Sequence, residues 1–262
     1  MTTPISGDGG RPPVSAPRRN ATVAVVGAGD YIGAAIARRF ARAGYTVFAG
    51  RRHGDKLASL VAEIAADGGL CIGRTLDARR EEAVAEFFAE ADETAPLEVA
   101  VFNVGANVNF ALLETTERVF RKVWELACCA GFLTGREAAR CMLRHGGGSI
   151  FFTGATASLR GGAGYAAFAS AKFGLRALAQ SMVRELGPKN IHVAHLVIDA
   201  GVDTAWVRER IRTRSGSAGA DRLEPDRLVS PTSIAEIYWR LHQQPRDSWT
   251  HELDIRPYRE PW

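Results

Sequence analysis

Residues 21–33 read ATVAVVGAGDYIG, and this stretch decides the fold. Its first half, Ala21–Val26, is a short apolar run rich in valine, which predicts a buried β-strand. Three glycines follow, and a helix is expected to begin near Ile32. A glycine turn between a strand and a helix lets the backbone approach a pyrophosphate, and the helix start offers free N–H groups and a positive dipole end. We therefore expect dinucleotide binding by Gly27, Gly29, Asp30, Tyr31, Ile32 and Gly33.

The rest of the chain continues the alternation of strand and helix. Long helical patterns are expected over Gly54–Asp67, Thr116–Leu143 and Gly164–Leu186. Repeated strand–helix units predict an α/β fold, a single-domain Rossmann-type doubly wound parallel sheet of about seven strands with helices on both faces. After Ala21–Val26, the expected strands are Tyr45–Ala49, Leu70–Leu76, Leu97–Phe102, Ser149–Thr153, Ile191–Ile198 and Glu252–Ile255.

Two segments stand outside this alternation. Residues 1–20 are rich in proline, arginine, glycine and serine, which predicts a flexible N-terminal tail before a domain over 21–262. Residues 199–226 are polar, rich in arginine and without periodicity, apart from a short helix expected at Trp206–Arg212. A long loop of this kind indicates a mobile lid over a ligand site.

Composition argues against nucleic-acid, membrane and metal partners. The chain has 262 residues, a net charge of +4 and a pI near 9.0, but its basic residues are interleaved with acids, which predicts a solvated surface and no nucleic-acid partner. No apolar run has the length of a membrane span, so we expect no membrane partner. The four cysteines form no metal or disulfide pattern, and the histidines have no ligand spacing, so we expect no metal site and a cytoplasmic protein.

The end of the second expected strand indicates which coenzyme binds. An NAD-binding fold usually has a carboxylate there, which holds the ribose 2′-hydroxyl. This chain has Arg51 and Arg52 instead. Guanidinium groups suit a 2′-phosphate, so the sequence predicts NADP(H) over NAD(H). Two solvated surface arginines are the alternative.

These features together resemble the short-chain dehydrogenase/reductase family over almost the whole chain. The glycine loop resembles the family pattern, with Tyr31 at the place of its middle glycine. The resemblance implies a small-molecule substrate and a homodimer or homotetramer whose subunits contact each other near Trp124 and Phe173. It implies that Asp77 contacts the adenine of the coenzyme. It also implies that Thr204 holds the nicotinamide carboxamide. The further cofactor residues that it implies are Ala78, Asn103, Val104, Gly105, Lys172 and Val202.

The resemblance is incomplete at the catalytic positions. Lys172 matches the family lysine, but the tyrosine four residues before it is Phe168, the family serine is Ala155, and the family asparagine aligns with Cys128. Phenylalanine keeps the shape of tyrosine without its proton. The loss of general acid catalysis typically costs about 10²–10⁴-fold in rate. The chain is therefore interpreted as a divergent member that lacks the usual serine and tyrosine.

Other hydroxyls could replace the missing groups. Tyr165, Phe168 and Lys172 share one helix face, so Tyr165 is the first candidate for the proton donor. Thr156 is the candidate ligand of the carbonyl oxygen, and Lys172 completes the expected catalytic set. One hypothesis is an NADP(H)-dependent oxidoreductase that transfers a hydride between nicotinamide and a carbonyl or alcohol with a non-standard proton donor. The alternative is a catalytically inactive NADP(H)-binding protein that acts as a sensor or partner subunit.

Overall fold

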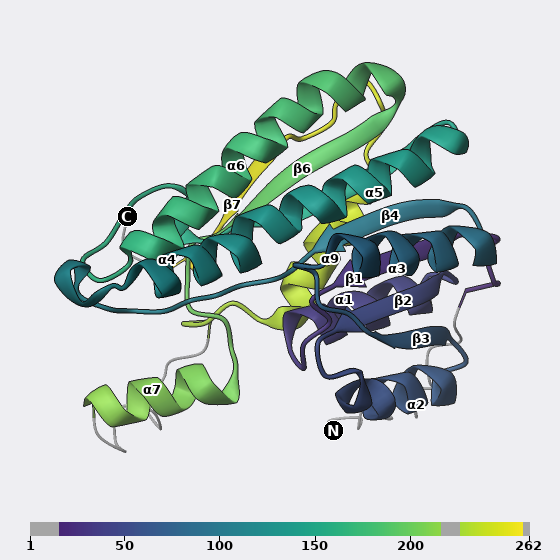
Figure 1. The fold of residues 1–262 in the computed structure, drawn as a ribbon. Coiled ribbons are helices and arrows are strands. Elements are labelled where there is room, and N and C mark those ends of the chain that lie inside the picture. Colours follow the sequence, from purple (N-terminus) through teal and green to yellow (C-terminus); the bar gives the residue numbers. More distant parts are fainter. Residues whose placement is uncertain (1–15, 216–225, 259–262) are drawn as a thin grey trace, which may run out of the picture.

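The computed structural model describes residues 16–215 and 226–258 and contains one seven-stranded sheet (Figure 1). Every neighbouring pair of strands is parallel, in the order β3-β2-β1-β4-β5-β6-β7. This order confirms the predicted doubly wound sheet, since the chain reverses direction across the sheet between β3 and β4. The strands are β1 (Thr22–Val26), β2 (Thr46–Arg51), β3 (Leu70–Thr75), β4 (Leu97–Phe102), β5 (Gly148–Thr153), β6 (Ile191–Ile198) and β7 (Glu252–Ile255).

Helices cover both faces of the sheet. One buried cluster joins the sheet to α1, α2 and α9, and a second joins its other face to α3, α5 and α6. Figure 1 shows α7 standing apart from both helical layers. The α-helices are α1 (Ile32–Arg42), α2 (Ala58–Ala66), α3 (Glu81–Thr94), α4 (Glu117–Trp124), α5 (Ala130–Arg144), α6 (Ala166–Leu186), α7 (Ala205–Ser215) and α9 (Pro231–His242). The short helical turns are η1 (Gly54–Leu57), η2 (Leu112–Glu114), η3 (Glu125–Cys129), η4 (Thr156–Ser158) and η5 (Gly187–Lys189).

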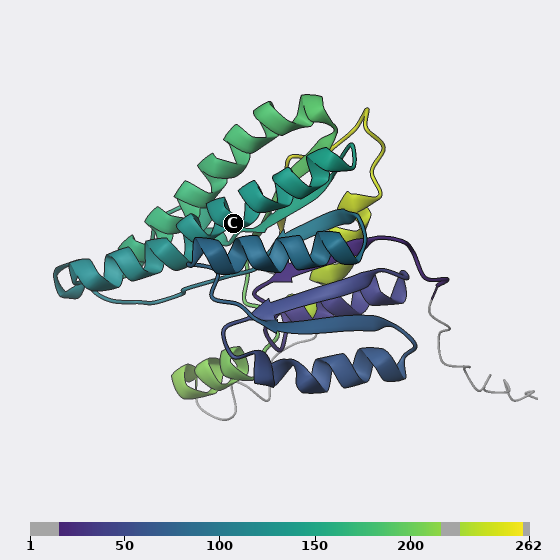
Figure 2. The same cartoon turned by 45° about the vertical axis from the view of Figure 1, so that its right-hand side comes forward.

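The expected helix over Thr116–Leu143 forms without a break, but it contains a π-turn. The structure has α4 and α5 joined through η3, a π-helical turn that holds Cys128. Figure 2 shows this stretch as one long rod that reaches past the strands. A π-turn adds a residue to one helical turn, and such turns often occur at functional sites. Here η3 packs against α6, the helix that carries Lys172.

The two segments outside the alternation are described in part. Residues 1–15 of the expected tail and residues 216–225 of the expected lid lie outside the described residues. Residues 16–20 are held against the domain, because Ala16 N donates to Arg42 O and Arg19 N to Gly44 O. The lid region carries α7, which is longer than the expected helix. None of the helices over the described residues has the length and apolar character needed to span a bilayer.

Candidate active site

The glycine loop after β1 is shaped by two close approaches and one open position. Gly27 has φ +87°, and a Cβ there would lie 2.6 Å from Asn103 O. A Cβ on Gly33 would lie 2.6 Å from Gly27 O. By contrast, a Cβ on Gly29 would meet no atom within 4 Å. Gly27 and Gly33 therefore permit the turn and the helix packing, and Gly29 leaves the outer side of the loop open to a ligand.

The other loop residues connect it to the neighbouring elements. Asp30 Oδ1 accepts a hydrogen bond from Arg51 Nη1 at 2.6 Å, which ties the loop to the end of β2. The Tyr31 hydroxyl accepts from Ala205 N at 3.1 Å, which ties it to the start of α7. The Ile32 side chain lines the larger of the two cavities described below. The loop is thus tied to both β2 and α7.

A cavity of about 230 Å³ lies at the ends of β1, β2 and β3. Arg51, Arg52, Asp77 and Ala78 line it together with the glycine loop. The Asp77 carboxylate accepts hydrogen bonds from Arg79 Nε at 2.9 Å and Nη2 at 2.5 Å. These bonds lower the pKa of Asp77. The cavity thus brings the two predicted guanidinium groups together with the predicted adenine-binding aspartate.

A larger cavity of about 650 Å³ lies next to the first. Both are lined by Asn103, Val104 and Gly105, the segment that follows β4. Asn103 Nδ2 donates to Gly27 O at 3.1 Å, so the segment is fixed to the glycine loop. A Cβ on Gly105 would meet no atom within 4 Å. The shared segment places the two cavities side by side, with Arg51 and Arg52 lining one and Lys172 lining the other.

Lys172 lies at the base of the larger cavity and is 3% exposed. Its Nζ donates to Thr153 O at 2.8 Å and to Val104 O at 3.3 Å. Burial lowers the pKa of Lys172 to about 8, because a charged ammonium loses its hydration. The amine is thus fixed beside the segment shared by both cavities, where it can donate to a hydroxyl.

Apolar side chains stand next to this amine. The Phe168 ring is 6% exposed, and its centroid lies 5.9 Å from Lys172 Nζ. Ala155 also lines the cavity, after β5. Cys128 packs with Phe168 in a third buried cluster, and burial raises the pKa of its thiol. Such a thiol is a small apolar side chain and a poor nucleophile.

Thr156 is engaged with a buried carboxylate. Its Oγ1 donates to Asp199 Oδ1 at 2.6 Å. Asp199 also accepts two hydrogen bonds from Arg160, at 3.0 and 3.1 Å, and pairs with Arg256 at 2.7 Å. Burial raises the pKa of Asp199, but the hydrogen bonds and the two guanidinium charges outweigh burial and lower it overall. The Thr156 hydrogen is therefore directed at Asp199 in this conformation and is turned away from a carbonyl ligand.

Tyr165 lines the larger cavity, but it lies immediately before α6 and not on it. The expected helix face therefore includes Phe168 and Lys172 but not Tyr165. Its hydroxyl accepts a hydrogen bond from Arg210 Nη2 of α7 at 3.3 Å. Its own hydrogen therefore remains available to a ligand. Val202 also lines this cavity. The buried Thr204 caps α7, since its Oγ1 accepts from Val207 N at 3.2 Å.

The sequence did not single out Arg160 and Arg210. Both are arginines in polar segments, and only the packing of η4 and α7 brings them to one cavity. The sequence did not single out Asp199 either, because its partners lie 39 to 57 positions away in the chain. Within residues 16–215 and 226–258, no three His, Cys, Asp or Glu residues are grouped to hold a metal ion.

Residues 21–215 match the family model described as short chain dehydrogenase. The 3-oxoacyl-[acyl-carrier-protein] reductase MabA of Mycobacterium tuberculosis is 30% identical over 240 residues, covering 90% of this chain and 89% of that protein. The L-rhamnose 1-dehydrogenase (NAD(P)(+)) of Azotobacter vinelandii is 31% identical, covering 80% of this chain and 87% of that protein.

Two solved structures are similar over nearly their full length. A short-chain dehydrogenase from Rhodopseudomonas palustris is 62% identical with a TM-score of 0.79, covering 92% of this chain and 100% of that one. An alcohol dehydrogenase from Thermococcus sibiricus, complexed with 5-hydroxy-NADP, is 28% identical with a TM-score of 0.76. That match covers 92% of this chain and 99% of the other.

Proposed function

Because the chain belongs to the short-chain dehydrogenase family, we propose that it is an NADP(H)-dependent oxidoreductase with a non-standard proton donor. It would transfer a hydride between nicotinamide and a carbonyl or alcohol substrate. The observation that carries the proposal is the pair of cavities that share Asn103, Val104 and Gly105. One cavity offers two guanidinium groups and the other a buried lysine. The 5-hydroxy-NADP in the Thermococcus sibiricus structure supports this choice of coenzyme.

The residues present fit a phosphorylated dinucleotide. The open sides of Gly29 and Gly105 leave room for it along the backbone. Arg51 and Arg52 would bind the 2′-phosphate, Asp77 the adenine, and Lys172 the ribose hydroxyls. The first turn of α1 would add N–H groups that have no acceptor within the helix. When bound, the coenzyme supplies or accepts the hydride.

A residue of the chain must then donate a proton to the carbonyl oxygen. We propose that the chain diverges from the family at Ala155 and Phe168, neither of which has a hydrogen to donate. Tyr165 would donate the proton to the carbonyl oxygen, and the Arg210 guanidinium beside it would stabilise the resulting phenolate. Thr156 would serve as a ligand of that oxygen only after releasing its hydrogen bond to Asp199.

A second function is favoured by the same apolar positions. Phe168 packs against the cavity beside Lys172, and no hydroxyl stands in its place. A protein that binds NADP(H) without turnover, as a sensor or a partner subunit, would need no proton donor there. In this alternative the protein retains the coenzyme site but catalyses no reaction.

The two functions are separated by binding and turnover measured on the same protein. Calorimetry should detect NADPH binding that is tighter than NADH binding, and NADPH oxidation should be followed with a panel of carbonyl compounds. In the oxidoreductase, Tyr165→Phe should lower turnover by about 10²-fold or more with little change in NADPH affinity. Tyr258→Phe is the matched control, because that tyrosine is 73% exposed and does not line the cavity.

Turnover unchanged in Tyr165→Phe would reject Tyr165 as the donor. NADPH binding with no turnover of any compound would favour the inactive function. In that case Phe168→Tyr combined with Ala155→Ser should create measurable turnover. If neither coenzyme bound, both functions would be wrong.

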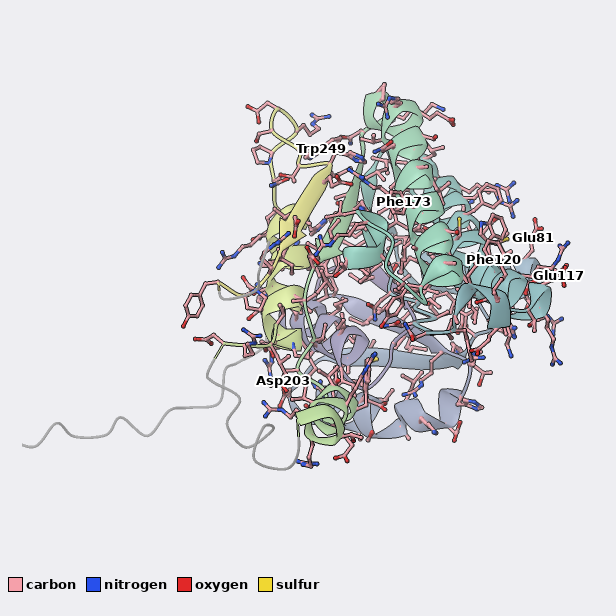
Figure 3. The ribbon with its side chains drawn as sticks, turned by 90° about the vertical axis from the view of Figure 1, so that its left-hand side faces the viewer. Glu81, Glu117, Phe120, Phe173, Asp203 and Trp249 are labelled. Atoms are coloured by element: carbon pink, nitrogen blue, oxygen red, sulfur yellow. The ribbon has the colours of Figure 1, made fainter. Side chains whose placement is uncertain are left out.

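We also propose a homodimer or homotetramer in the cytoplasm. Aromatic side chains that are 39% to 43% exposed occur on α4 and α6, at Phe120, Trp124 and Phe173. Figure 3 shows Phe120 and Phe173 on the same side of the molecule. The four cysteines are free, as is usual in a reducing compartment.

A further inference from the structure

The larger cavity is lined by positively charged side chains and by no negatively charged ones among the described residues. Its charged lining side chains, among the described residues, are Arg160, Lys172 and Arg210, and no carboxylate lines it. Most of the remaining lining is apolar. A positive, largely apolar cavity favours a ligand that has an apolar body and a negative group.

Two of the three cations already have a partner or an assigned role. Lys172 donates to two backbone carbonyls at the base of the cavity, and its third N–H is the one that the proposed function assigns to the coenzyme ribose. Arg160 makes two hydrogen bonds to the buried Asp199 carboxylate, so its charge is already paired.

Arg210 is different from its neighbours on α7. Arg208 pairs with Asp203, which Figure 3 marks beside α7, and Arg212 pairs with Glu209. Arg210 has no carboxylate partner among the described residues, and its one hydrogen bond goes to the Tyr165 hydroxyl. Several of its N–H donors thus remain available inside the cavity.

We infer that the substrate carries a carboxylate, and that Arg210 binds it. The inference rests on the proposed function, since it names the substrate class of that site. A planar guanidinium can hold a carboxylate through two parallel hydrogen bonds, and the apolar surroundings strengthen the attraction. Trp206 and Ile211, which flank Arg210 on α7, and Phe168 would contact the apolar body of the substrate.

The position of Arg210 also limits where the carboxylate lies on the substrate. Arg210 Nη2 lies 3.3 Å from the hydroxyl of Tyr165, the proposed proton donor to the carbonyl oxygen. A carboxylate bound by the other N–H groups of Arg210 therefore lies close to the reacting carbonyl. The substrate class is thus a carbonyl compound that carries its carboxylate a few bonds from the reacting carbon.

The test uses hexanoate and its uncharged analogue hexanamide as probes, because neither can react. Calorimetry on the NADPH-saturated protein should show that hexanoate binds at least tenfold more tightly than hexanamide. Saturation with NADPH prevents the probe from occupying the coenzyme phosphate sites. Arg210→Gln should lower hexanoate affinity at least tenfold and leave hexanamide affinity unchanged. Arg210→Lys, which keeps the charge but loses the planar pair of donors, should give an intermediate value.

Arg212→Gln is the matched control, because it lies two residues away on α7 and does not line the cavity. It should bind hexanoate as the wild type does. Equal binding of the two probes, or equal losses in Arg210→Gln and Arg212→Gln, would overturn the inference. So would a loss of NADPH affinity alone in Arg210→Gln. If NADPH fails to bind the wild type, the proposed function fails, and the same comparison on the protein without coenzyme still tests Arg210.

Discussion

At the scale of single residues, Lys172 combines a buried amine with hydrogen bonds to two carbonyl oxygens. Those bonds fix its position, and burial penalises its charge. Burial lowers the pKa of Lys172 to about 8, whereas an unfolded lysine titrates near 10.4. At a pH between these two pKa values, the unfolded chain binds more protons than the folded one. The free energy of unfolding therefore increases as pH rises.

This linkage predicts how Lys172→Met changes stability with pH. The wild type should gain about 3 kcal/mol in free energy of unfolding through this group between pH 7 and above pH 10, and the variant should not. Urea unfolding without coenzyme at both pH values measures the difference. The exposed Lys189→Met variant is the control, and its difference from the wild type should be similar at both. A pH-independent difference for Lys172→Met would show that the buried amine stays charged without cost.

At the scale of elements, different glycines of the loop serve the fold and the ligand: Gly27 permits the turn, and Gly29 leaves space for the coenzyme. Gly27→Ala places a Cβ 2.6 Å from Asn103 O at φ +87°, so it should lower the free energy of unfolding by about 1–3 kcal/mol. Gly29→Ala meets no atom, so its stability should match the wild type. It should nevertheless weaken NADPH binding at least tenfold, because the methyl group occupies the open side of the loop. Thermal unfolding and calorimetry measure the two effects. Wild-type NADPH affinity in Gly29→Ala would place the coenzyme elsewhere.

The elements also show what sequence patterns can predict. The apolar runs at β4 (Leu97–Phe102) and β6 (Ile191–Ile198) were predicted to the residue, because buried parallel strands are apolar on both faces. The π-turn at Glu125–Cys129 was missed, since one extra residue in a helical turn leaves the apolar periodicity nearly unchanged.

The candidate site was predictable only where its residues are local in the chain. The glycine loop follows from a short motif, and Lys172 from the resemblance to the short-chain dehydrogenase/reductase family. The engagement of Thr156 by Asp199 joins η4 to the end of β6, 43 residues away, and the contact between Tyr165 and Arg210 depends on where α7 packs. Such contacts arise from tertiary packing, and no spacing in the sequence records them.

At the scale of the whole molecule, the exposed aromatic side chains of α4 and α6 support the proposed association of chains. Trp124 and Phe173 are 43% and 41% exposed. They lie close together, because Trp124 Nε1 is 3.8 Å from the position of a Cβ on Gly174, the residue after Phe173. Exposed aromatic residues gathered on one face are typical of the core of a protein–protein interface.

Association through this face predicts a mass of two or four chains of 28.3 kDa, measured by light scattering after size exclusion. Trp124→Glu combined with Phe173→Glu should halve that mass, to one chain from a dimer or to two chains from a tetramer, because two carboxylates would be buried without partners in the interface. Ala62→Glu is the control: it adds a carboxylate to an exposed position of α2, which packs on the other face of the sheet, and it should leave the mass unchanged. The proposed interface fails if the wild type elutes as a single chain or if the double variant keeps its assembled mass. NADPH binding should survive in the dissociated variant, because neither residue lines either cavity.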